Sequence, residues 1–130
     1  MAKFNQIIFA SALCLIAAAF DAVAQNKEVL LEVRILKIQK NKGRLVVDIY
    51  RDKGTGLEKP YARKIMSTEN EQAVVSLMVP AGTYAISIYQ DINSNGKLDS
   101  NFINIPKEPI GFGNNYRPFG PPKYSAASVV

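Results

Sequence analysis

The chain has 130 residues and a net charge of +5, with 16 Lys and Arg against 11 Asp and Glu. It has no His and a single Cys, so the commonest general base and the commonest transition-metal ligand are missing, and no disulfide can form within it. An enzyme would have to work with carboxylates, Lys, Tyr or Ser, and the Gly-x-Ser-x-Gly motif of serine hydrolases does not occur. We therefore expect a protein that is not an enzyme. Because its cations are spread along the chain, we also expect no nucleic-acid binding.

Residues 1 to about 24 are arranged as a cleavable secretory signal peptide. Its three parts are the early cation Lys3, the apolar run from Ile7 to Phe20 and the small residues Ala22, Val23 and Ala24. The apolar run is shorter than the roughly 20 residues that span a bilayer, so no integral membrane anchor is expected. The sequence predicts export to the periplasm or the cell exterior, with residues 25–130 forming one mature domain.

Two strands are expected at the start of the mature chain. Between residues 29 and 38, and again between 44 and 50, apolar and polar side chains alternate with the period of two that is typical of half-buried strands. The short polar segment Lys40–Gly43 lies between them. Because a short turn between two alternating strands favours a hairpin, we predict that these two strands pair with each other.

A second hairpin is predicted between residues 74 and 88, where the turn Pro80-Ala81-Gly82 separates two alternating segments. Residues 51–70 show no clear period, and we expect a long connection with a short helical turn near residues 61–66. The side chains predicted to face the core are Leu31, Val33, Ile35, Leu45, Val47, Ile49, Val75, Leu77, Val79, Tyr84, Ile86 and Ile88.

The alternation stops after Gln90. Residues 91–123 are rich in Asn, Gly, Pro and Phe and are expected to form one long loop, and only residues 124–130 again have the pattern of a strand. A long loop in a compact domain is usually functional. With short alternating strands and no strong helix, the sequence predicts an all-β fold, namely a single antiparallel β-sandwich with a long C-terminal loop.

The segment from Asp91 to Asp99 has the ligand spacing of a calcium loop. Oxygen-bearing side chains fall at positions 1, 3, 5 and 9 of the loop, and Gly96 at position 6 suits the sharp turn. Hard oxygen ligands favour Ca²⁺ over transition metals. Position 12 is Phe102 in place of a bidentate Glu, so Asp99, Glu108 or water would have to complete the shell. The predicted ligands are the side chains of Asp91, Asn93, Asn95 and Asp99 and the carbonyl oxygen of Lys97.

The same residues allow a second interpretation. Asn and Asp side chains often cap their own backbone and tolerate left-handed conformations. The segment would then be an Asx-rich turn that holds no metal. Both interpretations remain open at this point.

The second half of the long loop contains residues suited to binding. They are Phe112, Asn114, Asn115, Tyr116 and Arg117. Aromatic faces beside amides and a cation could stack on a glycan or hold a peptide. Alternatively, the aromatic side chains fasten the loop to the sandwich.

Three motifs together resemble a known family. They are VPAGTYAI at residues 79–86, QDINSNGKLD at residues 90–99 and IPKEPIGFGNN at residues 105–115. In this order they resemble the bacterial exported family called domain of unknown function 2141, over roughly residues 29–130. The resemblance implies a small extracytoplasmic β-sandwich, similar to immunoglobulin-like, transthyretin-like and carboxypeptidase-regulatory modules, with no assigned activity. Family members usually continue into a closing strand, so we expect either that the last strand is truncated or that a sheet edge stays open.

The leading hypothesis is a non-catalytic extracytoplasmic β-sandwich. Its loop 91–123, stiffened by Ca²⁺, would present a binding surface to a cell-envelope protein or a glycan. The alternative is a structural or assembly module, with an empty Asx-rich turn and an open edge that accepts a strand from another chain. An enzyme of unknown type is the third hypothesis.

Overall fold

The computed structural model describes residues 27–51, 54 and 57–130, and the predicted signal peptide lies outside these residues. The elements are the strands β1 (Glu28–Leu36), β2 (Arg44–Tyr50), β3 (Ala62–Ser67), β4 (Gln72–Pro80), β5 (Tyr84–Asp91), β6 (Ile110–Phe112) and β7 (Ser128–Val129), the 3₁₀ turn η2 (Gly113–Asn115) and the short helix α1 (Tyr124–Ala127). Within the described ranges, no helix has both the length and the apolar character to cross a membrane.

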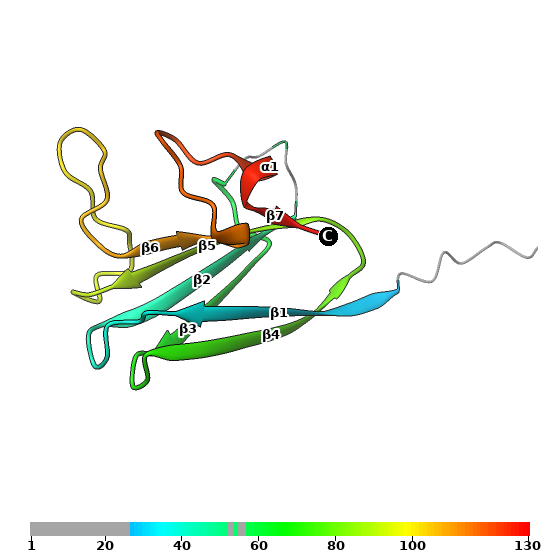
Figure 1. The fold of residues 1–130 in the computed structure, drawn as a ribbon, viewed down its shortest axis with the longest axis horizontal. Helices are drawn as coiled ribbons and strands as arrows, with labels where there is room; N and C mark the ends of the chain where they lie inside the picture. Colours follow the sequence, from blue (N-terminus) through cyan, green and yellow to red (C-terminus); the bar gives the residue numbers. More distant parts are fainter. Residues whose placement is uncertain (1–26, 52–53, 55–56) are drawn as a thin grey trace, which may run out of the picture.

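The strands form two antiparallel sheets (Figure 1). β1 pairs with β4 in a sheet of two strands, and the second sheet has the order β3-β2-β5-β6. β7 pairs with the start of β5, so β6 and β7 share one edge of that strand. The prediction of an all-β, antiparallel fold is confirmed.

The main apolar core draws side chains from both sheets. Its buried members are Val33, Ile35, Ile38, Leu45, Val47, Val75 and Ile86, and Leu31 and Ile88 pack against it. A second cluster of Ile49, Val79 and Tyr84 continues it, with Leu77 packed alongside. All the side chains predicted to face the core therefore do so, because alternation along a half-buried strand places every second side chain on the same face.

The two central strands, β2 and β5, are buried on both faces along most of their length. On the face away from the main core, Tyr50 and Ala85 pack with Ala127 of α1, and Phe112 and Tyr116 cover them. The long C-terminal region therefore acts as a lid over the outer face of the larger sheet.

Both predicted hairpins are wrong. β1 pairs with β4 and β2 pairs with β5, so each of the two short turns carries the chain from one sheet to the other. Backbone groups far away in the sequence fix the two turns. The N–H of Ile38 donates to the carbonyl of Glu71 (3.0 Å), and the N–H of Ala81 donates to the carbonyl of Lys27 (2.8 Å). Turn length alone does not distinguish a hairpin from a crossing of this kind.

Residues 61–66 contain no helical turn, because most of this segment belongs to the edge strand β3, which pairs with β2. Most β3 side chains are exposed, so this strand lacks the alternation of apolar and polar residues by which a half-buried strand is recognised in the sequence. The predicted strand at residues 124–130 is also only partly correct, since α1 precedes β7 there. The predicted loop 91–123 contains the short strand β6.

Candidate binding site

The Asx-rich loop begins at the end of β5, where one carboxylate organises it. Asp91 is fully buried. Its two oxygens accept the N–H groups of Asn95 (3.0 Å) and Gly96 (2.9 Å). The guanidinium of Arg44, at the start of β2, also donates to Asp91 (3.1 Å). Asp91 therefore closes the turn at the first position of the predicted calcium loop.

Three further predicted ligands converge on one another. Asp99 accepts hydrogen bonds from the amide nitrogen of Asn93 (2.6 Å) and from that of Asn95 (2.8 and 3.0 Å). The amide oxygens of the two asparagines accept the N–H groups of Asn95 (3.2 Å) and Lys97 (3.1 Å). The loop is therefore self-capped in this structure, and the amide nitrogens of Asn93 and Asn95 donate to Asp99.

Both carboxylates of this loop have a lowered pKa. Burial alone would raise the pKa of Asp91, but the N–H of Gly96, the guanidinium of Arg44 and the N–H of Asn95 outweigh it and lower the pKa from 3.8. The amides of the neighbouring asparagines lower the pKa of Asp99. Both groups are therefore ionised at neutral pH and hold the loop in its turn.

The base of the loop is fixed by Glu108, which is buried. Its two oxygens accept the N–H groups of Ile92 (2.8 Å) and Asp99 (3.0 Å). Glu108 thus uses both oxygens on backbone groups instead of completing a metal shell. The next residue, Pro109, accepts the N–H of Gln90 (2.9 Å) and leads directly into β6.

The predicted donors fit a weak Ca²⁺ site after two local changes. The amides of Asn93 and Asn95 would have to rotate so that their oxygens replace their nitrogens. Arg44 would also have to release Asp91. Within the described part of the chain, no three or more Asp, Glu, Cys or His side chains converge as a metal-binding group. Amide and carbonyl oxygens would therefore supply much of the shell, and a site with few carboxylates binds Ca²⁺ weakly.

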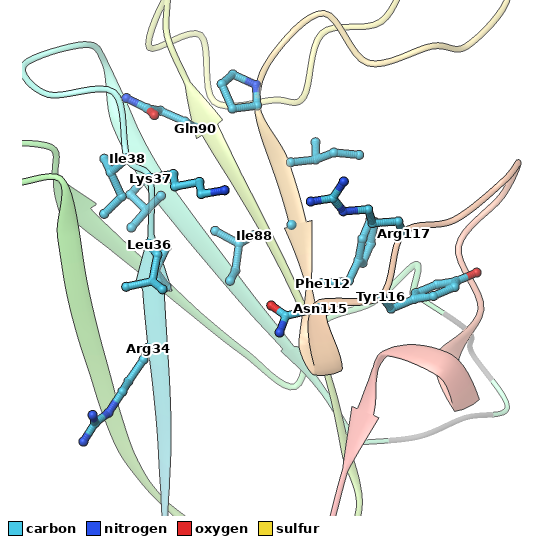
Figure 2. Close-up of a pocket in the computed structure, with 15 residues that line it drawn as sticks. Arg34, Leu36, Lys37, Ile38, Ile88, Gln90, Phe112, Asn115, Tyr116 and Arg117 are labelled. Carbon is cyan, nitrogen blue, oxygen red and sulfur yellow. The ribbon is translucent and has the colours of Figure 1, made fainter.

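A cavity of about 630 Å³ lies between the edge of β1 and β6 (Figure 2). Its walls are residues 34–38, residues 109–112 and residues 115–117, and Leu45, Ile88 and Gln90 complete it. Its size is in the range of small-molecule sites, roughly 300–1,000 Å³. Because Glu108 and Pro109 connect the Asx-rich loop to one wall, the loop and the cavity form one continuous structure.

Two cations, Lys37 and Arg117, line the cavity. In Figure 2 the strand β6 lies between the amine of Lys37 and the guanidinium of Arg117, and Arg34 points away from both. No Asp or Glu in the described part of the chain lines the cavity. Among the residues that the structure describes, neither Lys37 nor Arg117 takes part in an ion pair. The mouth of the cavity is therefore positively charged.

Left-handed backbone forms both polar walls of the cavity. Lys37 has φ 62° and Asn115 has φ 53°. Asn adopts this conformation readily, but for Lys it costs roughly 1–2 kcal/mol. The conformation interrupts the alternation of β1, so that Ile38 is buried while Lys37 stays exposed. Strained residues of this kind are common at binding sites.

The structure gathers four of the five residues of the predicted binding surface around the cavity. Phe112, Asn115, Tyr116 and Arg117 line it. Asn114 does not, because its amide donates to the carbonyl of Ser128 and fastens the C-terminal segment. The rings of Phe112 and Tyr116 meet edge to face, with their centroids 5.8 Å apart. These aromatic side chains therefore also fasten the loop to the sheet.

Two charged features could not be recognised from the sequence. One is Lys37, which lines the same cavity as Arg117, a cation far along the chain. The other is Asp48, which lies in an apolar strand and binds Arg63 through two hydrogen bonds of 2.6 and 2.7 Å. A single Asp within an apolar run was the available signal. A smaller cavity beside this pair, of about 350 Å³, has its carboxylate and guanidinium already satisfied by each other.

Comparison with known proteins identifies one relationship. A family model described as "Uncharacterized protein conserved in bacteria (DUF2141)" matches residues 33–130. The match includes the Asx-rich loop and every wall of the cavity, and it confirms the resemblance that the three motifs indicated. No curated protein and no solved structure matches the chain.

Proposed function

Since the chain belongs to the DUF2141 family, whose description assigns no activity, we propose a function from the site alone. The protein is an exported, non-catalytic binding module of the cell envelope. Its cavity holds a ligand, or part of a partner, that has an anionic head group and an apolar body. Export rests on the signal peptide expected at residues 1 to about 24.

The proposed scaffold is a Greek-key β-sandwich. In support, the main core draws on both sheets, and the connection after β4 crosses between them. Tyr84, at the start of β5, donates its hydroxyl to the carbonyl of Pro80 (2.5 Å). A tyrosine that bonds to backbone a few residues upstream at such a corner is typical of Greek-key sandwiches. This scaffold leaves the cavity open at the side between β1 and β6.

The observation that carries the proposal is a cavity whose lining holds two cations, Lys37 and Arg117, together with apolar side chains. Leu45, Ile88 and Ile110 are among the apolar lining residues, and among the described residues no Asp or Glu belongs to the lining. Both cations are exposed. Cations without a carboxylate partner attract a carboxylate or phosphate, and the apolar lining stabilises whatever hydrocarbon or ring is attached to it. A neutral glycan fits less well, because Phe112 and Tyr116 pack on each other instead of presenting flat faces.

Calcium has a supporting role in this proposal. Ca²⁺ bound by Asp91, Asn93, Asn95, Asp99 and the Lys97 carbonyl would stiffen the loop whose base continues into the cavity wall. The absence of His from the chain supports a non-catalytic role.

The test is a calorimetric titration of residues 25–130 with dodecyl phosphate below its micellar concentration. We expect measurable binding, and much weaker binding of dodecyltrimethylammonium, which has the same chain and the opposite charge. Lys37→Met and Arg117→Met should each weaken binding about three- to fivefold, because an exposed charge contributes up to about 1 kcal/mol.

The matched control is Lys64→Met, since Lys64 is an exposed cation on the edge strand β3 and does not line the cavity. It should leave the affinity unchanged. Equal affinity for the two head groups, or equal losses in all three variants, would refute the proposal.

A second function is favoured by the unpaired sheet edges. β1 and β4 are nine-residue strands, and among the described residues each pairs only with the other. Such edges can accept a strand from another chain, which supports the assembly module. Dimerisation that depends on concentration, and that a Pro at Arg34 abolishes, would favour this alternative.

A further inference from the structure

The loop between β5 and β6 has an ordered turn at its tip, and this turn exposes apolar side chains. Asn101 closes the turn, because its side-chain oxygen accepts the N–H groups of Ile103 (3.0 Å) and Ile105 (2.9 Å). Its backbone N–H donates to the carbonyl of Ile105 (2.9 Å), and a bridge between Ser100 and Pro106 follows. The tip is thus held by its own hydrogen bonds.

The three side chains on this turn, which we call the apolar tip, contact little of the protein. Phe102 is 96% exposed, Ile103 59% and Ile105 54%. Large exposed apolar side chains on a rigid support usually mark a contact surface. The turn holds these side chains away from the rest of the domain, so they are available to contact another molecule.

A second loop adds to this surface. In Figure 1 the loop between β5 and β6, in yellow, and the loop between η2 and α1, in orange, both extend on the side away from β1 and β4. The second loop carries Phe119, which is fully exposed. Two loops of one face therefore present Phe and Ile side chains to the surroundings.

Exposed lysines lie near both loops. Lys97 and Lys107 flank the apolar tip and Lys123 follows Phe119, and within the described ranges none of the three forms an ion pair. Two acidic residues lie in the first loop: Asp99 is half-buried and binds the amides of the asparagines, and Glu108 is buried and binds backbone N–H groups. The exposed charges near the apolar side chains are therefore cations.

We propose that the apolar tip and Phe119 dock the protein onto the surface of an anionic lipid bilayer. Apolar side chains enter the boundary between head groups and acyl chains, while lysines at the base meet lipid phosphates. The surface differs from the cavity, so this proposal does not depend on the one above. We favour a lipid surface over a protein partner because cations are the exposed charges nearest to the apolar side chains.

The chain has no Trp, which gives a direct probe. In Phe102→Trp, the indole should shift its emission to the blue when vesicles of phosphatidylcholine mixed with phosphatidylglycerol are added. Vesicles of phosphatidylcholine alone should give a smaller shift, and high salt should reverse the shift with anionic vesicles. Leu30→Trp is the matched control, because Leu30 is 60% exposed but lies on β1. Its emission should not change.

Sedimentation with the same anionic vesicles provides the second measurement. Phe102→Ser should weaken binding at least about tenfold, and Lys107→Gln about fivefold. Both variants should melt at the temperature of the parent, since neither side chain is buried. The proposal is overturned if Phe102→Trp shows no shift with anionic vesicles. A shift that instead follows protein concentration without lipid would also overturn it, since the tip would then be a self-association surface.

Discussion

The ion pair between Asp48 and Arg63 offers a sharp test of how this sheet is stabilised. The two residues lie directly opposite each other on β2 and β3. The Asp48 side chain is only 4% exposed, whereas that of Arg63 is 44% exposed. The hydrogen bond to Asp48 raises the pKa of Arg63. In Arg63→Met the carboxylate stays buried and loses two charged hydrogen bonds.

Breaking a buried ion pair costs about 3–5 kcal/mol, but Arg63 is half-exposed, so we expect about 2–3 kcal/mol. For a domain near 100 residues, each kcal/mol lowers the melting temperature by about 4–8 °C. Arg63→Met should therefore melt about 10–20 °C below the parent, as measured by circular dichroism.

The exposed pair Arg34–Glu32 is the matched control, with side chains 77% and 41% exposed. Arg34→Met should cost less than about 1 kcal/mol. The double variant Asp48→Leu/Arg63→Met should recover much of the lost stability, because it removes the orphaned charge. If Arg63→Met melts within about 2 °C of the parent, or if the two Arg variants behave alike, the reasoning is wrong.

Three further predictions concern the Asx-rich loop. Gly43→Ala should destabilise the fold by more than about 1–2 kcal/mol in urea unfolding, because Gly43 has φ 59° and an added Cβ would overlap the Asp91 carbonyl; Gly111→Ala, with open space around it, should be nearly neutral. Excess Ca²⁺ at about ten times a Kd of 10⁻⁴ to 10⁻³ M should raise the melting temperature by about 6–11 °C relative to chelator, and Asn93→Ala should reduce this shift; equal melting temperatures for the parent would contradict a calcium site. Because Asp91 and Asp99 have lowered pKa values in the fold, their stabilisation is complete above the ordinary 3.8 and is lost as pH falls through the lowered values. Melting scans from pH 5 downward should therefore show a decline in the parent that Asp99→Asn makes shallower.

The faces of the strands could be predicted because burial is a local property of an alternating strand. Val33 and Ile86 face the core as their neighbours in sequence indicate. Strand pairing could not be predicted in the same way. The segment after β1 is fixed by the amide of Gln90, which donates to Gln39 (2.6 Å) and Lys42 (2.7 Å) from another strand. No local pattern contains that contact.

The candidate site also has one part that could be predicted from the sequence and one part that could not. The Asx-rich turn is visible in the sequence, because Asp91 and Asp99 and the asparagines between them act within one short segment. The cavity is not visible in the sequence, because Lys37 and Arg117 are far apart in the chain and line one cavity only after folding. The left-handed backbone of Lys37, which sets its position at the rim, could not be predicted from the residue types.

The crossing of both short turns between sheets has a consequence for how the chain folds. Neither β1–β4 nor β2–β5 joins strands that are neighbours in sequence. No tight hairpin is therefore available as a nucleus, and loop closure must come before most strand contacts form. Domains dominated by such contacts fold in milliseconds to seconds, and we expect refolding here to be at the slow end of that range. Slow folding would suit the export that we propose, because a chain crosses a membrane in extended form.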